Sequence, residues 1–229
     1  MHIDSRRVSS NQLHTHTNLP SLLQRHLQHR HRKPVAEHSR TAFDVLREAL
    51  ESQPRPLVLD SFCGTGRSTA LLAQRHPKHL VVGVDKSAHR LARHVETKDE
   101  NYLLLQAECE DIWQLLLGAE IPLEYHYLLY PNPWPKSRHI QRRVHGNATF
   151  PWLLRLGGII ELRSNWRLYV EEFGLAMHLA GYCGNVFLLP EADPLTLFEE
   201  KYRASGHELW AYVGDTSKKL HRDATGVLG

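Results

Sequence analysis

The chain has 229 residues, 41% of which are hydrophobic, and a formal net charge of +3 at pH 7. This length and apolar fraction can bury one good-sized core, while no apolar run reaches membrane length or resembles a signal-peptide core, which argues against a membrane protein. The three cysteines, Cys63, Cys109 and Cys183, are odd in number and far apart, which predicts reduced thiols in a cytoplasmic protein.

Residues 1–38 predict a basic arm ahead of the folded domain. The first forty residues hold seven Arg or Lys, seven His and only two acids, a composition typical of a disordered segment that favours a polyanion. His26, His29 and His31 could suggest a metal site, but neither a cysteine nor a carboxylate lies beside them. We therefore expect a solvated cationic arm and no metal.

Apolar spacing after the arm predicts alternating helices and strands. Residues 39–50 have the helical spacing of one buried face. Further helices are expected at 67–76, 87–97, 110–117, 140–155 and 166–180. Short strands are expected at 57–60, 80–84, 102–106, 125–130, 158–163, 184–189 and 207–213. This alternation predicts an α/β domain over residues 39–215 with a mostly parallel, doubly wound sheet, and a flexible tail over 216–229.

Residues 57–85 place a strand, a glycine-containing turn, a helix and a second strand in the order of a nucleoside site. Gly64 and Gly66 let backbone amides approach a ligand, and Asp85, about 20 residues further on, can hold ribose hydroxyls. Asp85 could instead cap the helix that begins at Ser87. The turn lacks the full GxGxxG pattern and a Walker lysine, so S-adenosylmethionine fits better than NAD or ATP.

Residues 131–143 read PNPWPKSRHIQRR and are the most specific stretch of the chain. The prolines fix the backbone and remove amide donors, so we expect a loop of set shape rather than a helix or an inner strand at the start of this stretch. An indole and a polar side chain are followed by Lys136, Arg138, His139, Arg142 and Arg143. Such a set suits a site for a base and its phosphates, although a solvated basic turn has the same composition.

These two segments together resemble the bacterial tRNA (guanine-N7-)-methyltransferase family over roughly residues 34–213. The loop carries the resemblance, and two weaker motifs follow it, Ser164-Asn165-Trp166 and Thr196-Leu197-Phe198-Glu199-Glu200-Lys201. The resemblance implies a Rossmann-like class I methyltransferase fold with a seven-stranded sheet and an antiparallel last strand. It also implies S-adenosylmethionine as the cofactor and tRNA as the partner, and leaves a monomer and a homodimer both open.

The resemblance further implies a role for each matched residue. Asn132 and Glu199 are the expected catalytic residues, beside the methyl group and at the guanine edge. The expected cofactor-binding residues are Asp60, Ser61, Gly64, Gly66, Asp85, Glu108, Cys109 and Asn132, with Glu108 at the position that reads the adenine amine. The expected substrate-binding residues are Lys136, Arg138, His139, Arg142, Arg143, Asn165, Thr196, Glu199 and Lys201.

Three departures from the family pattern bear on the site. Phe62 replaces the first glycine of the turn, and Asn132 and Asn165 stand where the family carries Asp, so two carboxylates have become uncharged amides. Guanine N7 has a lone pair and no proton, so its methylation needs positioning and electrostatics but no general base. The sequence favours guanine N7 of tRNA. It leaves open an exocyclic-amine methyltransferase, whose loop reads Asp/Asn-Pro-Pro-aromatic, and an RNA-binding relative without turnover.

Overall fold

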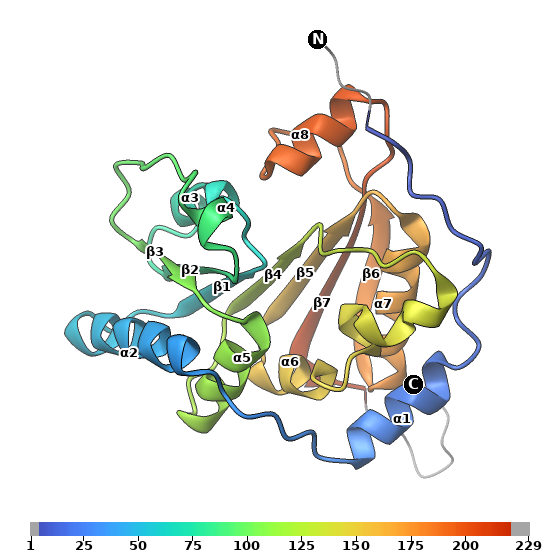
Figure 1. The fold of residues 1–229 in the computed structure, drawn as a ribbon, viewed down its shortest axis with the longest axis horizontal. Coiled ribbons are helices and arrows are strands. Elements are labelled where there is room, and N and C mark those ends of the chain that lie inside the picture. Colours follow the sequence, from blue (N-terminus) through green and yellow to red (C-terminus); the bar gives the residue numbers. More distant parts are fainter. Residues whose placement is uncertain (1–4, 221–229) are drawn as a thin grey trace.

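The computed structural model describes residues 5–220, which form a seven-stranded sheet flanked by helices (Figure 1). The strand order is β3-β2-β1-β4-β5-β7-β6. The strands are β1 (Leu57–Ser61), β2 (Leu80–Asp85), β3 (Tyr102–Gln106), β4 (Tyr125–Leu129), β5 (Ile159–Ser164), β6 (Tyr182–Leu188) and β7 (Trp210–Lys219). Strands β1 to β5 run parallel, and β7 pairs antiparallel with both β5 and β6. The predicted α/β class and the antiparallel last strand are confirmed.

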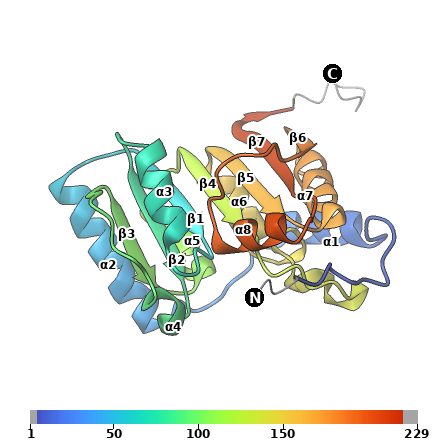
Figure 2. The same cartoon turned by 90° about the horizontal axis from the view of Figure 1, so that it is seen from above.

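Helices flank the sheet on both faces (Figure 2), and alternate side chains of its inner strands pack toward opposite faces. In β1, Leu57 and Leu59 belong to the larger core cluster, and Val58 belongs to a smaller cluster with Leu72 of α3. The larger cluster joins the sheet to α1, α2, α5, α6 and α7. The helices are α1 (Leu19–Gln28), α2 (Glu37–Ser52), α3 (Arg67–Arg75), α4 (Ala88–Leu91), α5 (Cys109–Gly118), α6 (Phe150–Leu156), α7 (Arg167–Leu179) and α8 (Leu197–Ala204).

The N-terminal segment is ordered from residue 5 onward, so the prediction of a disordered arm is wrong. It runs from beside α8 along one side of the domain to α1, and then crosses to α2 (Figure 1). Helix α1 buries Leu19, Leu22 and Leu23 in the larger core cluster. These leucines stand at i, i+3 and i+4, so they form one apolar helix face that anchors the segment despite its basic composition.

The helix expected at 140–155 is also wrong. The chain forms two 3-10 turns, η1 (Ser137–Arg142) and η2 (Val144–Gly146), before α6 begins at Phe150. Gly146 marks the break, because a Cβ there would lie 2.0 Å from the carbonyl oxygen of Ile140. The chain therefore folds tightly back on itself between Ile140 and Gly146.

Two further boundaries differ from prediction. The helix expected at 87–97 is the single turn α4, and β7 continues to Lys219, so the tail predicted from residue 216 begins as paired strand. The rest of that predicted tail, residues 221–229, lies outside the described residues. Within residues 5–220, no helix is both long and apolar enough to cross a membrane.

Candidate functional site

The predicted cofactor residues gather where β1 and β2 end side by side. Asp60 at the end of β1 is fully buried, and its Oδ2 accepts hydrogen bonds from Ser68 Oγ at 2.6 Å and Thr69 Oγ1 at 2.8 Å. Its other oxygen, Oδ1, is buried and has no hydrogen-bond partner among residues 5–220. Burial raises the pKa of the Asp60 carboxyl to about 6. An unpaired carboxylate oxygen of this kind fits a cationic ligand group.

The turn after β1 has the backbone that its glycines predicted. Gly64 and Gly66 have φ of +63° and +76°, and nothing lies within 4 Å of where a Cβ of Gly64 would stand, so a ligand can approach the backbone there. Phe62, the residue that replaces a family glycine, also has positive φ, at +64°. Its ring packs edge-on against Trp113 with centroids 6.1 Å apart, a contact that helps to hold a conformation costly for a residue with a Cβ.

Asp85 ends β2 beside this turn, as predicted. Its Oδ2 accepts from Gly64 N at 3.0 Å, its Oδ1 accepts from Ser87 N at 2.8 Å, and Arg90 forms an ion pair with it at 2.9 Å. Asp85 therefore fixes the turn and also helps to start α4, which supports the interpretation of this residue as a helix cap. Its contact with ribose stays a prediction.

Two predicted cofactor side chains have structural partners instead. Ser61 is buried, and its hydroxyl pairs with His126 Nε2 at 2.8 Å and accepts from Trp113 Nε1 at 3.0 Å. Cys109 is buried as well, with its Sγ accepting from Phe62 N at 3.2 Å, and burial raises the pKa of its thiol. Both side chains support the turn from within the core, and a contact of either residue with the cofactor stays a prediction. Glu108, by contrast, is partly exposed at the start of α5.

The loop after β4, residues 131–143 and hereafter the basic loop, leaves the sheet next to this turn. Trp134 has φ of +45°, and its backbone N–H donates to Asn132 Oδ1 at 3.3 Å. Asn132 is exposed at the tip of this turn. The side chain of Arg142 stacks over the Trp134 ring at 4.7 Å, and His139 meets the same ring edge-on at 5.6 Å. The Trp134 ring thus packs against the side chains of Arg142 and His139 and is not isolated in solvent.

The basic loop divides its cations between solvent and core. Lys136, Arg138 and Arg142 are exposed, as predicted. Arg143 is fully buried and forms an ion pair with Glu172, also fully buried, of α7. It also donates to the Trp134 carbonyl oxygen at 3.2 and 3.3 Å and stacks over Trp166 at 4.9 Å. Because its donors are used inside the protein, the prediction that Arg143 faces substrate is wrong.

Glu199 is likewise held inside the protein. Its carboxylate is fully buried and accepts from Arg163 at 3.1 and 3.2 Å and from Arg203 at 3.4 Å. Thr196 caps α8 by accepting from Glu199 N at 2.9 Å. In this arrangement a base cannot reach the Glu199 carboxylate, so its predicted place at the guanine edge is corrected to a structural ion pair.

The remaining predicted substrate residues lie near α8. Asn165 is half-buried and its side-chain amide pairs with His207 Nδ1 at 3.2 Å. Lys201 is exposed on α8. Among residues 5–220, no group of three or more His, Cys, Asp or Glu side chains could hold a metal ion.

The N-terminal segment contributes contacts that the sequence did not reveal. Ser10 Oγ donates to the Pro135 carbonyl oxygen at 2.6 Å, and the backbone N–H of His16 donates to Glu172 Oε1 at 2.7 Å. Gln12 donates to the same carboxylate at 2.5 Å and accepts from Arg143 at 3.1 Å. These residues have no local motif, because each partner lies more than a hundred positions away in the chain.

Comparison with known proteins now places the chain. Residues 54–212 match the family described as "Putative methyltransferase". The chain is 30% identical over 174 residues to the tRNA (guanine-N(7)-)-methyltransferase of Nitrosospira multiformis, a match that covers 71% of this chain and 75% of that protein. A protein of the same name from Aeromonas hydrophila is 30% identical over 178 residues, or 72% of this chain and 75% of the relative. The chain belongs to the tRNA (guanine-N7-)-methyltransferase family.

Solved structures agree on the fold of this methyltransferase. The 16S rRNA methyltransferase KamB superimposes with a TM-score of 0.53 at 20% identity, covering 75% of this chain and 93% of that one. A structure described as an antibiotic-related methyltransferase gives a TM-score of 0.53 at 12% identity, covering 80% and 96%. At such low identities these likenesses show the fold alone, the class I methyltransferase fold.

This methyltransferase uses S-adenosylmethionine, and the residues at the ends of β1 and β2 suit that cofactor. The open backbone at Gly64 admits the ligand without a side-chain clash, and the charge of Asp60, buried beneath the turn, can attract the ammonium of its methionine part. The contacts of Asp85 with the ribose and of Glu108 with the adenine amine, which the family resemblance implies, stay predictions. The side chains of Ser61 and Cys109 would support the turn from the core side.

Proposed function

We propose that this protein transfers the methyl group of S-adenosylmethionine to N7 of a guanine in tRNA, in the cytoplasm. The proposal rests on one observation above all: the basic loop brings Asn132 and three exposed cations together at the edge where β1 and β4 end side by side. The curated relatives named above carry this activity in their names. Cations beside a reactive edge suit a substrate with a phosphate backbone.

The chemistry proposed requires little of the protein beyond positioning. Bound S-adenosylmethionine supplies an electrophilic methyl group, and guanine N7 offers a lone pair with no proton to remove. Glu199 is buried in ion pairs and Asn132 is uncharged, so neither supplies a free carboxylate for the purine. The proposed role of Asn132 is therefore to orient the base through hydrogen bonds, while Asp60 and Asp85 hold the cofactor in line.

The test is a methylation assay on defined RNA. Purified protein is incubated with labelled S-adenosylmethionine and an unmodified tRNA transcript, and the labelled nucleoside is identified after digestion. We expect 7-methylguanosine. A transcript made with 7-deazaguanosine, which lacks the N7 atom, is the matched control and is expected to remain unlabelled.

Other outcomes would replace the proposal. A product methylated on an exocyclic amine would favour the second candidate, for which the neutral, exposed amide of Asn132 is the supporting observation. Binding of tRNA and cofactor without any product would identify an RNA-binding relative without turnover.

A further inference from the structure

Residues 5–16, hereafter the strap, run alongside the basic loop and are fastened at three points. At the first point, Ser5 N donates to Ser205 Oγ at 3.0 Å and the Ser5 carbonyl oxygen pairs with His207 at 2.7 Å. The second is the hydrogen bond from Ser10 to Pro135. The third is the Glu172 carboxylate, which accepts hydrogen bonds from the side-chain amide of Gln12 and from the backbone N–H of His16. The strap is therefore a fixed wall beside the basic loop.

A cavity of about 430 Å³ lies between the strap and the basic loop. Its lining residues are Ser9, Ser10, Asn11, Lys136, Ser137 and Arg138. No acidic residue lines it, and neither Lys136 nor Arg138 forms an ion pair within residues 5–220. Two uncompensated cations thus line the same open pocket as residues that carry hydroxyl and amide groups.

This combination of groups matches a phosphate diester. Phosphates in nucleic-acid complexes are bound by Arg and Lys together with Ser and Asn side chains, and these contacts set the register of the substrate. The cavity also lies close to the reacting edge, because Lys136 follows Asn132 by only four residues, at most about 14 Å of extended chain.

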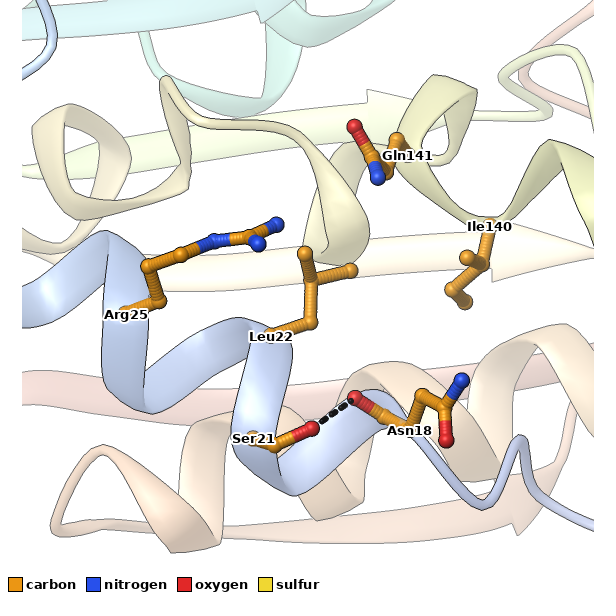
Figure 3. Close-up of a pocket in the computed structure, with 6 residues that line it drawn as sticks. All are labelled: Asn18, Ser21, Leu22, Arg25, Ile140 and Gln141. Atoms are coloured by element: carbon orange, nitrogen blue, oxygen red, sulfur yellow. Dashed lines mark hydrogen bonds between the residues drawn. The ribbon is translucent and has the colours of Figure 1, made fainter.

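The neighbouring groove between α1 and η1 has a different character (Figure 3). Arg25 is the one cation among its lining residues, and Leu22 and Ile140 form a buried apolar floor. Ser21 Oγ there is already occupied, donating to the Asn18 carbonyl oxygen at 3.1 Å. A phosphate is therefore favoured between the strap and the basic loop rather than in this groove.

We propose that the strap completes a binding site for one backbone phosphate of the RNA, close to the methylated nucleotide. Lys136 and Arg138 neutralise the phosphate, and Ser9 and Asn11 hydrogen-bond to its oxygens from the opposite wall. The inference rests on the proposed function, because it takes the substrate to be RNA. It adds that residues far from the basic loop in the chain belong to the substrate site.

The substitution Asn11→Asp tests this site with little risk to the fold. Asp keeps the oxygen that accepts from Ser137 N at 3.5 Å, and adds a negative charge where the phosphate would lie. We expect tRNA binding to weaken about tenfold or more. The slope of log affinity against log salt concentration should also become shallower by about 0.7 to 0.9, the value for one phosphate contact. Affinity for S-adenosylmethionine and the melting temperature should not change.

Asn18→Asp is the matched control, since it makes the same change of charge in the groove of Figure 3. Asn18 is the N-cap of α1 and its side chain makes no capping hydrogen bond, so Asp is well tolerated there. Equal loss of tRNA binding in both variants, or no loss in Asn11→Asp, would overturn the phosphate site. Failure of the proposed function is a separate result, because it is read from the nucleoside that the unaltered protein methylates.

Discussion

The cofactor turn after β1 and the basic loop after β4 leave neighbouring strands of one sheet, yet they are held in place differently. The cofactor turn is shaped mainly by contacts close in the chain, such as Asp60 with Ser68 and Thr69 and Gly64 with Asp85, with Cys109 supporting it from further along. The basic loop depends on Arg143, which reaches Glu172 on α7 and Gln12 on the strap. A short motif can therefore specify the first, while the second needs the whole fold.

The strongest test of this contrast is Glu172→Ala. It leaves Arg143 and His145 buried without their carboxylate, and breaking a buried pair in this way costs about 3–5 kcal/mol. We expect that loss in the free energy of urea unfolding. Glu171→Ala is the control from the same helix: its pair with Arg167 is exposed, so a loss of at most about 0.5 kcal/mol is expected. Equal losses would show that the buried pair does not anchor the basic loop.

The pKa of the Glu172 carboxylate predicts how the stability of the protein depends on pH. Although burial opposes its ionisation, hydrogen bonding from His145 and the charges of His145 and Arg143 lower the pKa of Glu172 to about 2. A depressed folded-state pKa adds stability above the ordinary value of about 4.3, and this contribution is lost as pH falls toward about 2. Between pH 5 and pH 2, the free energy of urea unfolding should fall more steeply with decreasing pH for the unaltered protein than for Glu172→Gln.

On the cofactor side, Asp85→Ala should act on ligand affinity. Asp85 orders the turn through Gly64 and is the residue expected to hold ribose. Loss of one or two hydrogen bonds to a charged group weakens binding by about 1.5–3 kcal/mol each. Titration calorimetry with S-adenosylmethionine measures the change directly, and an unaltered affinity would remove Asp85 from the cofactor site.

Asp60 should make cofactor affinity depend on pH. Burial raises its pKa to about 6, so in the free protein this carboxyl contributes stability that is present below its ordinary value of about 3.9 and is lost as pH rises through about 6. Its ionised form is the one that attracts an ammonium. Affinity for S-adenosylmethionine should therefore increase as pH rises through 6, by up to about tenfold per unit below the pKa. Asp60→Asn should give a flatter profile.

Substitutions of the exposed cations of the basic loop should affect RNA binding alone. Replacing both Lys136 and Arg138 with Ala is expected to reduce the slope of log affinity for tRNA against log salt by about 0.7 to 0.9 for each phosphate that is no longer neutralised, with stability nearly unchanged. Arg47, an exposed arginine of α2, provides a control substitution. A slope that stays constant in the double variant would identify the exposed cations as ordinary solvated surface.

The smallest effect is expected from Asn132→Asp. If guanine N7 is the acceptor, a carboxylate at this exposed position can balance positive charge on the purine, so the rate should be preserved or rise modestly. Single-turnover kinetics with saturating tRNA isolates this step. A large fall in rate would instead favour an exocyclic amine as the acceptor, because Asn132 would then be needed as a neutral hydrogen-bonding group.

Arg142 and Arg143 show what sequence could predict here and what it could not. The strands and the cofactor turn follow from apolar runs and glycines, whose effects are local. The two arginines are identical and adjacent, but one lies over Trp134 in solvent and the other is buried. The difference comes from Glu172, 29 residues further on, and from Gln12 on the strap. The burial of Glu199 could not be predicted for the same reason, because its partner Arg163 lies 36 positions away in the chain, on β5.

The strap also sets an order of events for a newly made chain. Its contacts join residues 125 to 200 positions apart, so the strap has to wait for partners that are made much later. At about 5–20 residues per second, that wait is on the order of ten seconds. The cofactor turn finds its own partners sooner, because the most distant of its hydrogen bonds within residues 57–85 joins Gly64 to Asp85, and Cys109 lies only 47 positions beyond Phe62. Competence to bind cofactor should therefore precede competence to bind RNA during synthesis.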